Sequence, residues 1–261
     1  MNFTKIFVLI SCISFLSLAE PIEDNSFLVE EAYNQDPGVV QFINVYQKSN
    51  KTKDWSYVFI NEIPILSRSH QFSYELPYSH VESTDKTGIG DVKLNYRYEI
   101  YGNEKFTTTG RLSYVTTTGK FEDGLGAGVN AYEASLVTSI KITEKWLQHW
   151  NVGATYSPKA KIASGDTADN NKYFWNLSNV YLITDSFNFM LEFASSQKET
   201  TIGKDRTEWG SQLIVSPSIR YGIDCGEWQF VPGLALPSTI GPNPGTENQT
   251  LVYLSIEGKL W

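Results

Sequence analysis

Segments in which apolar and polar residues alternate run through almost the whole sequence. The clearest is GDVKLNYRYEIY, residues 90–101, where every second residue from Val92 to Ile100 is apolar and the residues between them are polar or charged. Successive side chains of a β-strand point to opposite faces, so this segment predicts a strand with one apolar and one polar face. One such strand would suit a soluble or a membrane protein, so the number and spacing of these segments matter more.

Twelve segments have strand-like character, and most have about the ten residues that a tilted membrane-spanning strand needs. They are residues 39–48, 54–64, 71–79, 90–101, 106–115, 131–142, 146–156, 173–183, 187–195, 209–221, 228–236 and 250–261. Beyond the N-terminal leader described below, no apolar run approaches the roughly 18 residues of a membrane-spanning helix. The sequence therefore predicts an all-β fold.

The connections between these segments alternate in length. Residues 80–89, 116–130, 157–172, 196–208 and 237–249 form long connections, whereas 102–105, 143–145, 184–186 and 222–227 form short ones. Outer-membrane barrels have short periplasmic turns and long outer loops, while a secreted soluble β-sandwich, the alternative, has no reason for this alternation. We therefore predict a transmembrane antiparallel up-and-down β-barrel of about 12 strands, located in the bacterial outer membrane with its lipid as partner.

The N-terminus has the features of a secretory signal peptide. A short region with Lys5 is followed by the apolar stretch IFVLISCISFLSLA, and small residues precede Glu20. We expect residues 1–19 to be a removed signal peptide, with the lipoprotein-like LISC at residues 9–12 as the alternative. Residues 20–38 then form an acidic segment that is either periplasmic or plugs the lumen, and residues 39–261 form the outer-membrane β-barrel.

Charge and cysteine content exclude two classes of protein. The formal net charge is −8, and loss of residues 1–19 would leave 20 basic against 29 acidic residues, a net charge of −9. Such a surplus of acids disfavours nucleic acid as a partner. Cys225 is the only cysteine outside the leader, so no internal disulfide framework is expected.

Aromatic residues make up 14% of the chain and gather at the ends of the predicted strands. Membrane barrels carry aromatic girdles at both interfaces with water. We interpret the final residues, LVYLSIEGKLW, as the closing strand, paired with the first strand so that no sheet edge remains. Bacterial outer-membrane barrels commonly end on an aromatic that the assembly machinery reads, so we expect that machinery to bind the strand ending at Trp261.

The polar faces of the strands define the expected lining of the lumen. Its predicted members are Glu75, Asp91, Lys93, Asn95, Arg97, Glu99, Arg111, Glu133, Lys141, Glu192 and Arg220. Acids and bases nearly balance, which indicates mutual pairing across a narrow lumen and not a filter of one sign. If residues 20–38 fold into the lumen, we expect their acids to meet Lys93, Arg97 and Arg111.

No pattern typical of an enzyme or a metal site stands out. Two positions after the histidines, where outer-membrane phospholipases carry a nucleophilic serine, this chain has Phe72, Glu82 and Asn151. Asp166 and Asp169 carry oxygen ligands suited to Ca²⁺, but their spacing departs from an EF-hand and favours a solvated surface loop. We expect no catalytic residue, no cofactor and no metal.

Two blocks of sequence, IEDNSFLVEEAYNQDPGVVQ and GIGDVKLNYRY, resemble a family of Gram-negative outer-membrane proteins described as transporters of the MetA pathway of phenol degradation. The resemblance runs from residue 22 to the C-terminus, and outside the two blocks it consists mostly of the barrel pattern. It implies an outer-membrane β-barrel that passively transports small molecules, including hydrophobic or aromatic ones. The alternative is a structural or surface-interaction barrel with a closed lumen and no transport.

Overall fold

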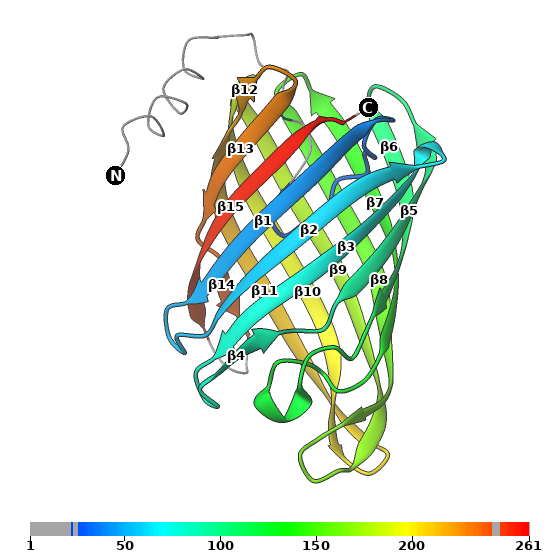
Figure 1. Cartoon of the computed structure of the whole chain (residues 1–261), viewed down its shortest axis with the longest axis vertical. Helices are drawn as coiled ribbons and strands as arrows, with labels where there is room; N and C mark the ends of the chain where they lie inside the picture. The colour runs from blue at the N-terminus through cyan, green and yellow to red at the C-terminus, as the bar shows by residue number, and fades with distance from the viewer. Residues whose placement is uncertain (1–21, 23–25, 242–245, 261) are drawn as a thin grey trace.

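The computed structural model describes residues 22, 26–241 and 246–260. Twelve antiparallel strands form a closed barrel, which confirms the predicted fold class (Figure 1). They are β1 (Val39–Ser49), β2 (Trp55–Ile65), β3 (Ser67–Val81), β5 (Lys93–Gly102), β6 (Phe106–Val115), β7 (Ala131–Thr143), β8 (Trp146–Lys161), β9 (Thr167–Thr184), β10 (Phe187–Gly203), β11 (Arg206–Tyr221), β13 (Trp228–Ala235) and β15 (Glu247–Lys259). Among the described residues, no helix has the length and apolar character needed to span a membrane.

Three short strands and one helical turn complete the wall and its loops. β4 (Lys86–Ile89) pairs with the end of β3, and β12 (Ile223–Cys225) pairs with the start of β13. β14 (Ser238–Ile240) continues the β13 position in the sheet between β11 and β15. A 3-10 turn, Phe121–Asp123, lies in the connection between β6 and β7.

The barrel closes by pairing the first strand with the last. β1 and β15 are in register from Val39 opposite Lys259 to Ser49 opposite Gln249. One residue further, the Leu260 N–H donates to the Gly38 carbonyl at 2.9 Å. The predicted closing strand is therefore β15, and it leaves no open edge at this seam. Trp261, with its predicted recognition by the assembly machinery, lies outside the described residues.

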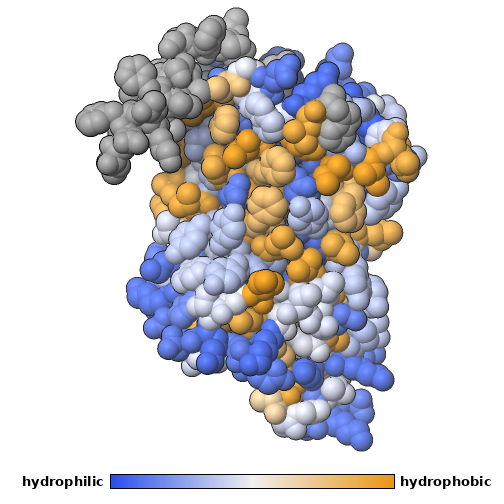
Figure 2. All heavy atoms as spheres, in the orientation of Figure 1, coloured by the Kyte–Doolittle hydropathy of each residue, from blue (hydrophilic) through white to orange (hydrophobic). Residues whose placement is uncertain are grey.

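The two faces of the wall differ as the alternation requires. On β5, Tyr98 is 45% exposed, whereas its neighbour Arg97 is 1% exposed and points inward. Figure 2 shows apolar side chains gathered over the upper part of the visible face and hydrophilic ones at the lower end. Of the aromatics at the ends of the predicted strands, those exposed on the outside are Tyr78, Tyr101, Phe106, Trp146, Tyr156, Tyr173, Trp175, Trp209 and Tyr221.

Two of the predicted long loops, residues 157–172 and 196–208, are wrong. Strands β8 to β11 continue through most of these residues and leave only 162–166 and 204–205 as turns. These strands have 16 to 18 residues, more than a membrane requires, and they project at the lower end of Figure 1. Outside lipid neither face of a strand needs to be apolar, so polar runs such as KETT hide this extension in the sequence.

Pro217 on β11 and Pro232 on β13 do not lie opposite each other. A turn centred on residues 222–227 would place Pro217 opposite Pro232, but Ser218 pairs with Ala235, so Pro217 lies beside Leu236. The cause is a tight turn after Cys225, which pairs with Trp228, and Gly226 there adopts a φ of 67°. The two missing N–H donors therefore fall at different levels of the wall.

The placement of the apolar band predicts how stability depends on depth. Val152 lies midway along the membrane part of β8 and is 56% exposed, so Val152→Arg would place a charge in lipid. We expect it to lower the free energy of unfolding by about 2–4 kcal/mol, measured by urea denaturation in phospholipid vesicles. Ile202, on the projecting part of β10 and 45% exposed, provides the control. Ile202→Arg should cost less than about 1 kcal/mol, and equal losses would contradict the assigned band.

Candidate functional site

Residues 26–38, called the lumen segment below, lie inside the barrel. Its bonding partners belong to strands all around the wall, from Gln71 on β3 and Thr109 on β6 to Glu192 on β10. Only a chain in the interior can contact inward-facing side chains on so many strands. The segment is also well shielded from solvent, with Val29 1% and Ala32 0% exposed.

The lumen segment forms a loop that enters and leaves at the end of the barrel where the short turns lie. Ile22 marks the entry, since its carbonyl accepts hydrogen bonds from Asn188 at 2.6 Å and Arg220 at 2.8 Å, near the β9–β10 turn. The exit is the start of β1 at Val39. Within residues 26–38 the chain reaches inward, and the backbone N–H and carbonyl of Glu30 form two hydrogen bonds with the Asn151 side chain at 2.9 and 2.8 Å.

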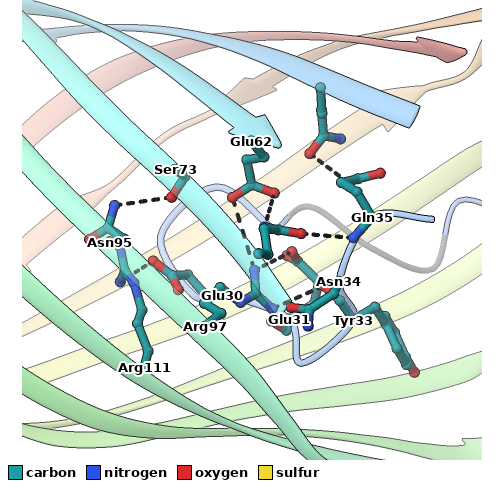
Figure 3. A network of polar contacts seen from close by, with 12 residues as sticks. Glu30, Glu31, Tyr33, Asn34, Gln35, Glu62, Ser73, Asn95, Arg97 and Arg111 are labelled. Carbon is teal, nitrogen blue, oxygen red and sulfur yellow. Dashed lines mark hydrogen bonds and ion pairs between the residues drawn. The ribbon is translucent and has the colours of Figure 1, made fainter. Parts of the chain in front are cut away.

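A network of acids and bases holds the innermost part of the segment (Figure 3). The Arg97 guanidinium lies 3.5 Å from the Glu31 carboxylate and 3.9 Å from that of Glu62 on β2. The Arg111 guanidinium pairs with Glu30 of the segment and lies 3.0 Å from Glu75 of β3. Two buried arginines of the wall thus share their charge between the wall and the segment.

The third base predicted to meet the segment pairs with the wall instead. The Lys93 ammonium lies 2.9 Å from Glu133 and 3.9 Å from Glu75. Asn95, next along the inner face of β5, donates to Ser73 and Glu75 at 3.1 Å each. These contacts place the central members of the predicted lining in one connected cluster.

The wall also satisfies the peptide groups of the segment. Arg97 donates to the carbonyls of Glu31 and Tyr33, and Thr109 donates to that of Ala32 at 2.6 Å. The carboxylate of Glu192 accepts the N–H groups of Leu28 and Val29 at 2.8 and 3.1 Å. Backbone N–H and C=O groups that are buried away from water need hydrogen-bond partners. Inward polar side chains of the strands provide these partners, as a neighbouring strand would in a sheet.

His149 also belongs to this lining and contacts a serine hydroxyl across the wall. Its Nδ1 lies 2.7 Å from the Ser139 hydroxyl, directly across the β7–β8 pair. The same hydroxyl accepts the Ala32 N–H at 2.8 Å, and both side chains are fully buried. The pair therefore faces the lumen segment at Ala32.

The lumen also contains two apolar clusters, which the sequence analysis missed. The Phe27 ring stacks on Tyr253 with centroids 4.4 Å apart. It also packs against two groups of buried residues, which are Ile43, Ala235, Leu251 and Tyr253 on one side and Leu147, Val180, Leu182 and Met190 on the other. A Cβ on Gly233 would stand 2.2 Å from the Phe27 ring. A glycine within a strand often marks such a close approach. Gly233 was therefore the feature of the sequence that could have indicated this packing.

Three residues of the predicted lining lie away from this cluster. The Asp91 carboxylate accepts the N–H groups of Gly119 and Ala127 at 2.8 and 2.6 Å and so fixes the connection between β6 and β7. Lys141 pairs with Glu144 at 3.2 Å beside a short turn, and Glu99 lies near the same end on β5. Position along a strand, which alternation does not report, separates these residues from the centre.

The Asp166 and Asp169 pair does not converge on a cation site. Asp169 accepts the Lys159 N–H at 2.8 Å and the Tyr156 hydroxyl at 2.9 Å, while Asp166 lies 3.1 Å from the Ser164 hydroxyl. Within the described part of the chain, no group of three or more potential metal ligands comes together. The two aspartates instead shape the β8–β9 hairpin.

Two cavities adjoin the innermost turn of the lumen segment. One of about 320 Å³ lies towards β5–β11 and is lined by residues that include Lys172, Phe174 and Ile214. The other, of about 210 Å³, lies towards β1–β3 and β15, beside Ile43 and Tyr253. Leu28, Glu30, Lys93 and Arg111 line both, so the segment and its ionic partners stand where the two cavities approach each other.

Comparison with known proteins identifies the architecture. No family model and no curated protein matches the sequence. The COG4313 outer membrane channel from Pseudomonas putida F1 has a similar structure, with a TM-score of 0.67 at 14% identity over 88% of this chain and 98% of that one. The NanC porin aligns with a TM-score of 0.59 at 12% identity over 84% and 100% of the two chains. The KdgM porin gives 0.56 at 10% identity over 85% and 99%.

These likenesses show the fold that this chain shares with outer-membrane barrels. The closed barrel of twelve strands, with its apolar band, fits the bacterial outer membrane. The sequence identities, 10 to 14%, carry information about architecture and not about what passes through the barrel.

A substitution at Glu192 should weaken the binding of the lumen segment to the wall without changing the residues of the segment. Glu192→Leu removes the acceptor for the Leu28 and Val29 N–H groups. We expect exchange of these two amides with solvent deuterium to quicken on the order of tenfold, in line with the cost of an unpaired buried donor. Glu192→Gln keeps a carbonyl oxygen and serves as the control. Unchanged exchange in the leucine variant would show that the segment is held elsewhere.

Proposed function

We propose that this protein is a passive outer-membrane channel for small molecules and that its lumen segment is a displaceable plug. The observation that carries this proposal is the position of residues 26–38 between two lumen cavities, with Glu30 at the point where they approach. Movement of this one segment would join the two spaces without any change in the twelve-strand wall.

The contacts of the plug suit reversible displacement. Its peptide groups bond to side chains such as Ser139, Asn151 and Gln71, and water can satisfy these side chains equally well. The net contribution of each such bond is about 0.5–1.5 kcal/mol, because water replaces it on opening. A strand of the wall lacks this option, since its backbone groups would face lipid.

The character of the lumen supports small solutes without a strong preference for charge sign. Arg97, Arg111 and Lys93 are each balanced by carboxylates, and buried pairs of this kind fix geometry more than they supply a net field. The residues that pack against Phe27 add an apolar surface to the lumen through which a solute would pass. Passage of hydrophobic or aromatic molecules, which the family resemblance implies, is part of this proposal.

A second candidate is a barrel that never opens and acts through its surface. The projecting hairpins of β8–β11 favour it, because they offer a large outer surface to a partner. We propose no catalytic role in either case, since the hydroxyl of the buried Ser139–His149 pair accepts a hydrogen bond from the Ala32 N–H. Transport measurements distinguish the two candidates.

A reversible crosslink tests whether the plug controls flux. The hydroxyls of Ser26 and Ser178 lie 2.7 Å apart, so Ser26→Cys with Ser178→Cys should form a disulfide that pins the segment to β9. In a Cys225→Ser background reconstituted in liposomes, we expect oxidation to suppress uptake of small solutes and reductant to restore it.

The single variant Ser26→Cys controls for oxidation itself and should transport equally under both conditions. Uptake that is the same in the oxidised and reduced double variant would contradict the plug. Absence of uptake in every form, including the wild type, would favour the closed barrel instead.

A further inference from the structure

Two lysines face each other where the barrel wall meets the projecting strands: Lys172 is half-buried and lines the larger cavity, whereas Lys198 is solvent-exposed. Lys172 on β9 is directly opposite Lys198 on β10, and residues so paired in an antiparallel sheet lie on the same face. The neighbouring pair, Ser196 opposite Phe174, shares that inner face, and Phe174 lines the larger cavity. Like charges directly opposite each other destabilise a sheet, so their presence here calls for a compensating partner.

The structure supplies little negative charge to offset them. Glu133 and Lys93 both lie close enough to Lys172 for electrostatic interaction, but Glu133 is bonded to Lys93 at 2.9 Å. Glu75 and Glu30 are likewise engaged with Arg111. Among the described residues, neither Lys172 nor Lys198 has a carboxylate within ion-pair distance.

The cavity beside Lys172 combines this charge with apolar and hydrogen-bonding surface. Its volume is about 320 Å³, at the lower end of the range for small-molecule sites. Phe174 lies beneath the Lys172 ammonium, 5.5 Å from its ring centroid, and Leu28, Val137 and Ile214 add apolar wall. Asn176 and Gln212 provide amide groups. A ligand that matches all three features has an anionic head and a compact apolar body.

We propose that this cavity is a binding site for small organic anions with an apolar body, such as aryl carboxylates. The carboxylate lies at the mouth of the cavity, beside the Lys172 ammonium group that lines it and near the exposed Lys198, and the apolar part lies against Phe174 and Leu28. This inference rests on the proposed channel function. In that channel the cavity is the site where a solute binds before the plug moves. Leu28 and Glu30 belong to both cavity wall and plug, so an occupant contacts the segment that has to move.

Equilibrium binding to the full detergent-solubilised protein tests the site without requiring transport. The probe is 4-fluorobenzoate, followed by the broadening of its fluorine NMR signal, and 4-fluorobenzamide is the neutral isostere. We expect saturable binding of the benzoate only, weakened by added salt. Lys172→Gln with Lys198→Gln should weaken it on the order of tenfold, as for loss of charge-assisted hydrogen bonds. Lys145→Gln, in the β7–β8 turn at the opposite end, should have no effect.

Each outcome decides the matter. Equal binding of benzoate and benzamide, or unchanged binding in the double lysine variant, would overturn the anion site. Heat-modifiable gel migration establishes that the variant barrel is folded. Benzoate binding is also measured for the single variants Lys172→Gln and Lys198→Gln, which test each lysine separately. Benzoate binding by a protein that passes no solute in liposomes would overturn the channel and leave the site. Solute flux without benzoate binding would do the reverse.

Discussion

The structure depends on one constraint, which is that a sheet in lipid must leave no backbone donor or acceptor unpaired. The pairing of β1 with β15 meets it by joining the ends of the wall over eleven residue pairs, Val39 to Ser49. Closure then forces every strand to send alternate side chains outward and inward. The apolar band outside and the crowded polar lumen inside are two consequences of that single requirement.

A closed barrel of this size still has to fill its interior, and this chain does so with its own N-terminal residues. Arg97 and Arg111 are buried on the inner wall, and a buried cation without partners would be costly. Glu30 and Glu31 supply part of the missing charge, while Phe27 fills the space between two apolar clusters beside Gly233. The wall therefore holds the plug by charge at Arg97 and Arg111 and by shape around Phe27. Neither lysine of the pair on β9 and β10 has a carboxylate within ion-pair distance among the described residues.

The period-two pattern was enough to predict the twelve strands, because lipid makes alternation obligatory wherever a strand crosses it. It failed at the projecting ends of β8–β11, where no lipid requires an apolar outer face and polar residues such as Thr200 are exposed. The position of Pro217 in the wall is also outside its reach, because register depends on a tight turn at Gly226 that composition alone does not locate. The inward direction of Arg97 and Arg111 was readable from the sequence, whereas their partners depend on the folded path of a segment without regular structure.

The most direct test of the central claim, that the lumen segment closes the barrel, is single-channel conductance in planar bilayers. We compare the full chain with a variant that lacks residues 26–36 and whose folding is verified by heat-modifiable migration. The account predicts that the full chain is closed most of the time and that the shortened chain shows a stable, larger conductance. Identical conductance of the two, whether both open or both closed, would contradict it.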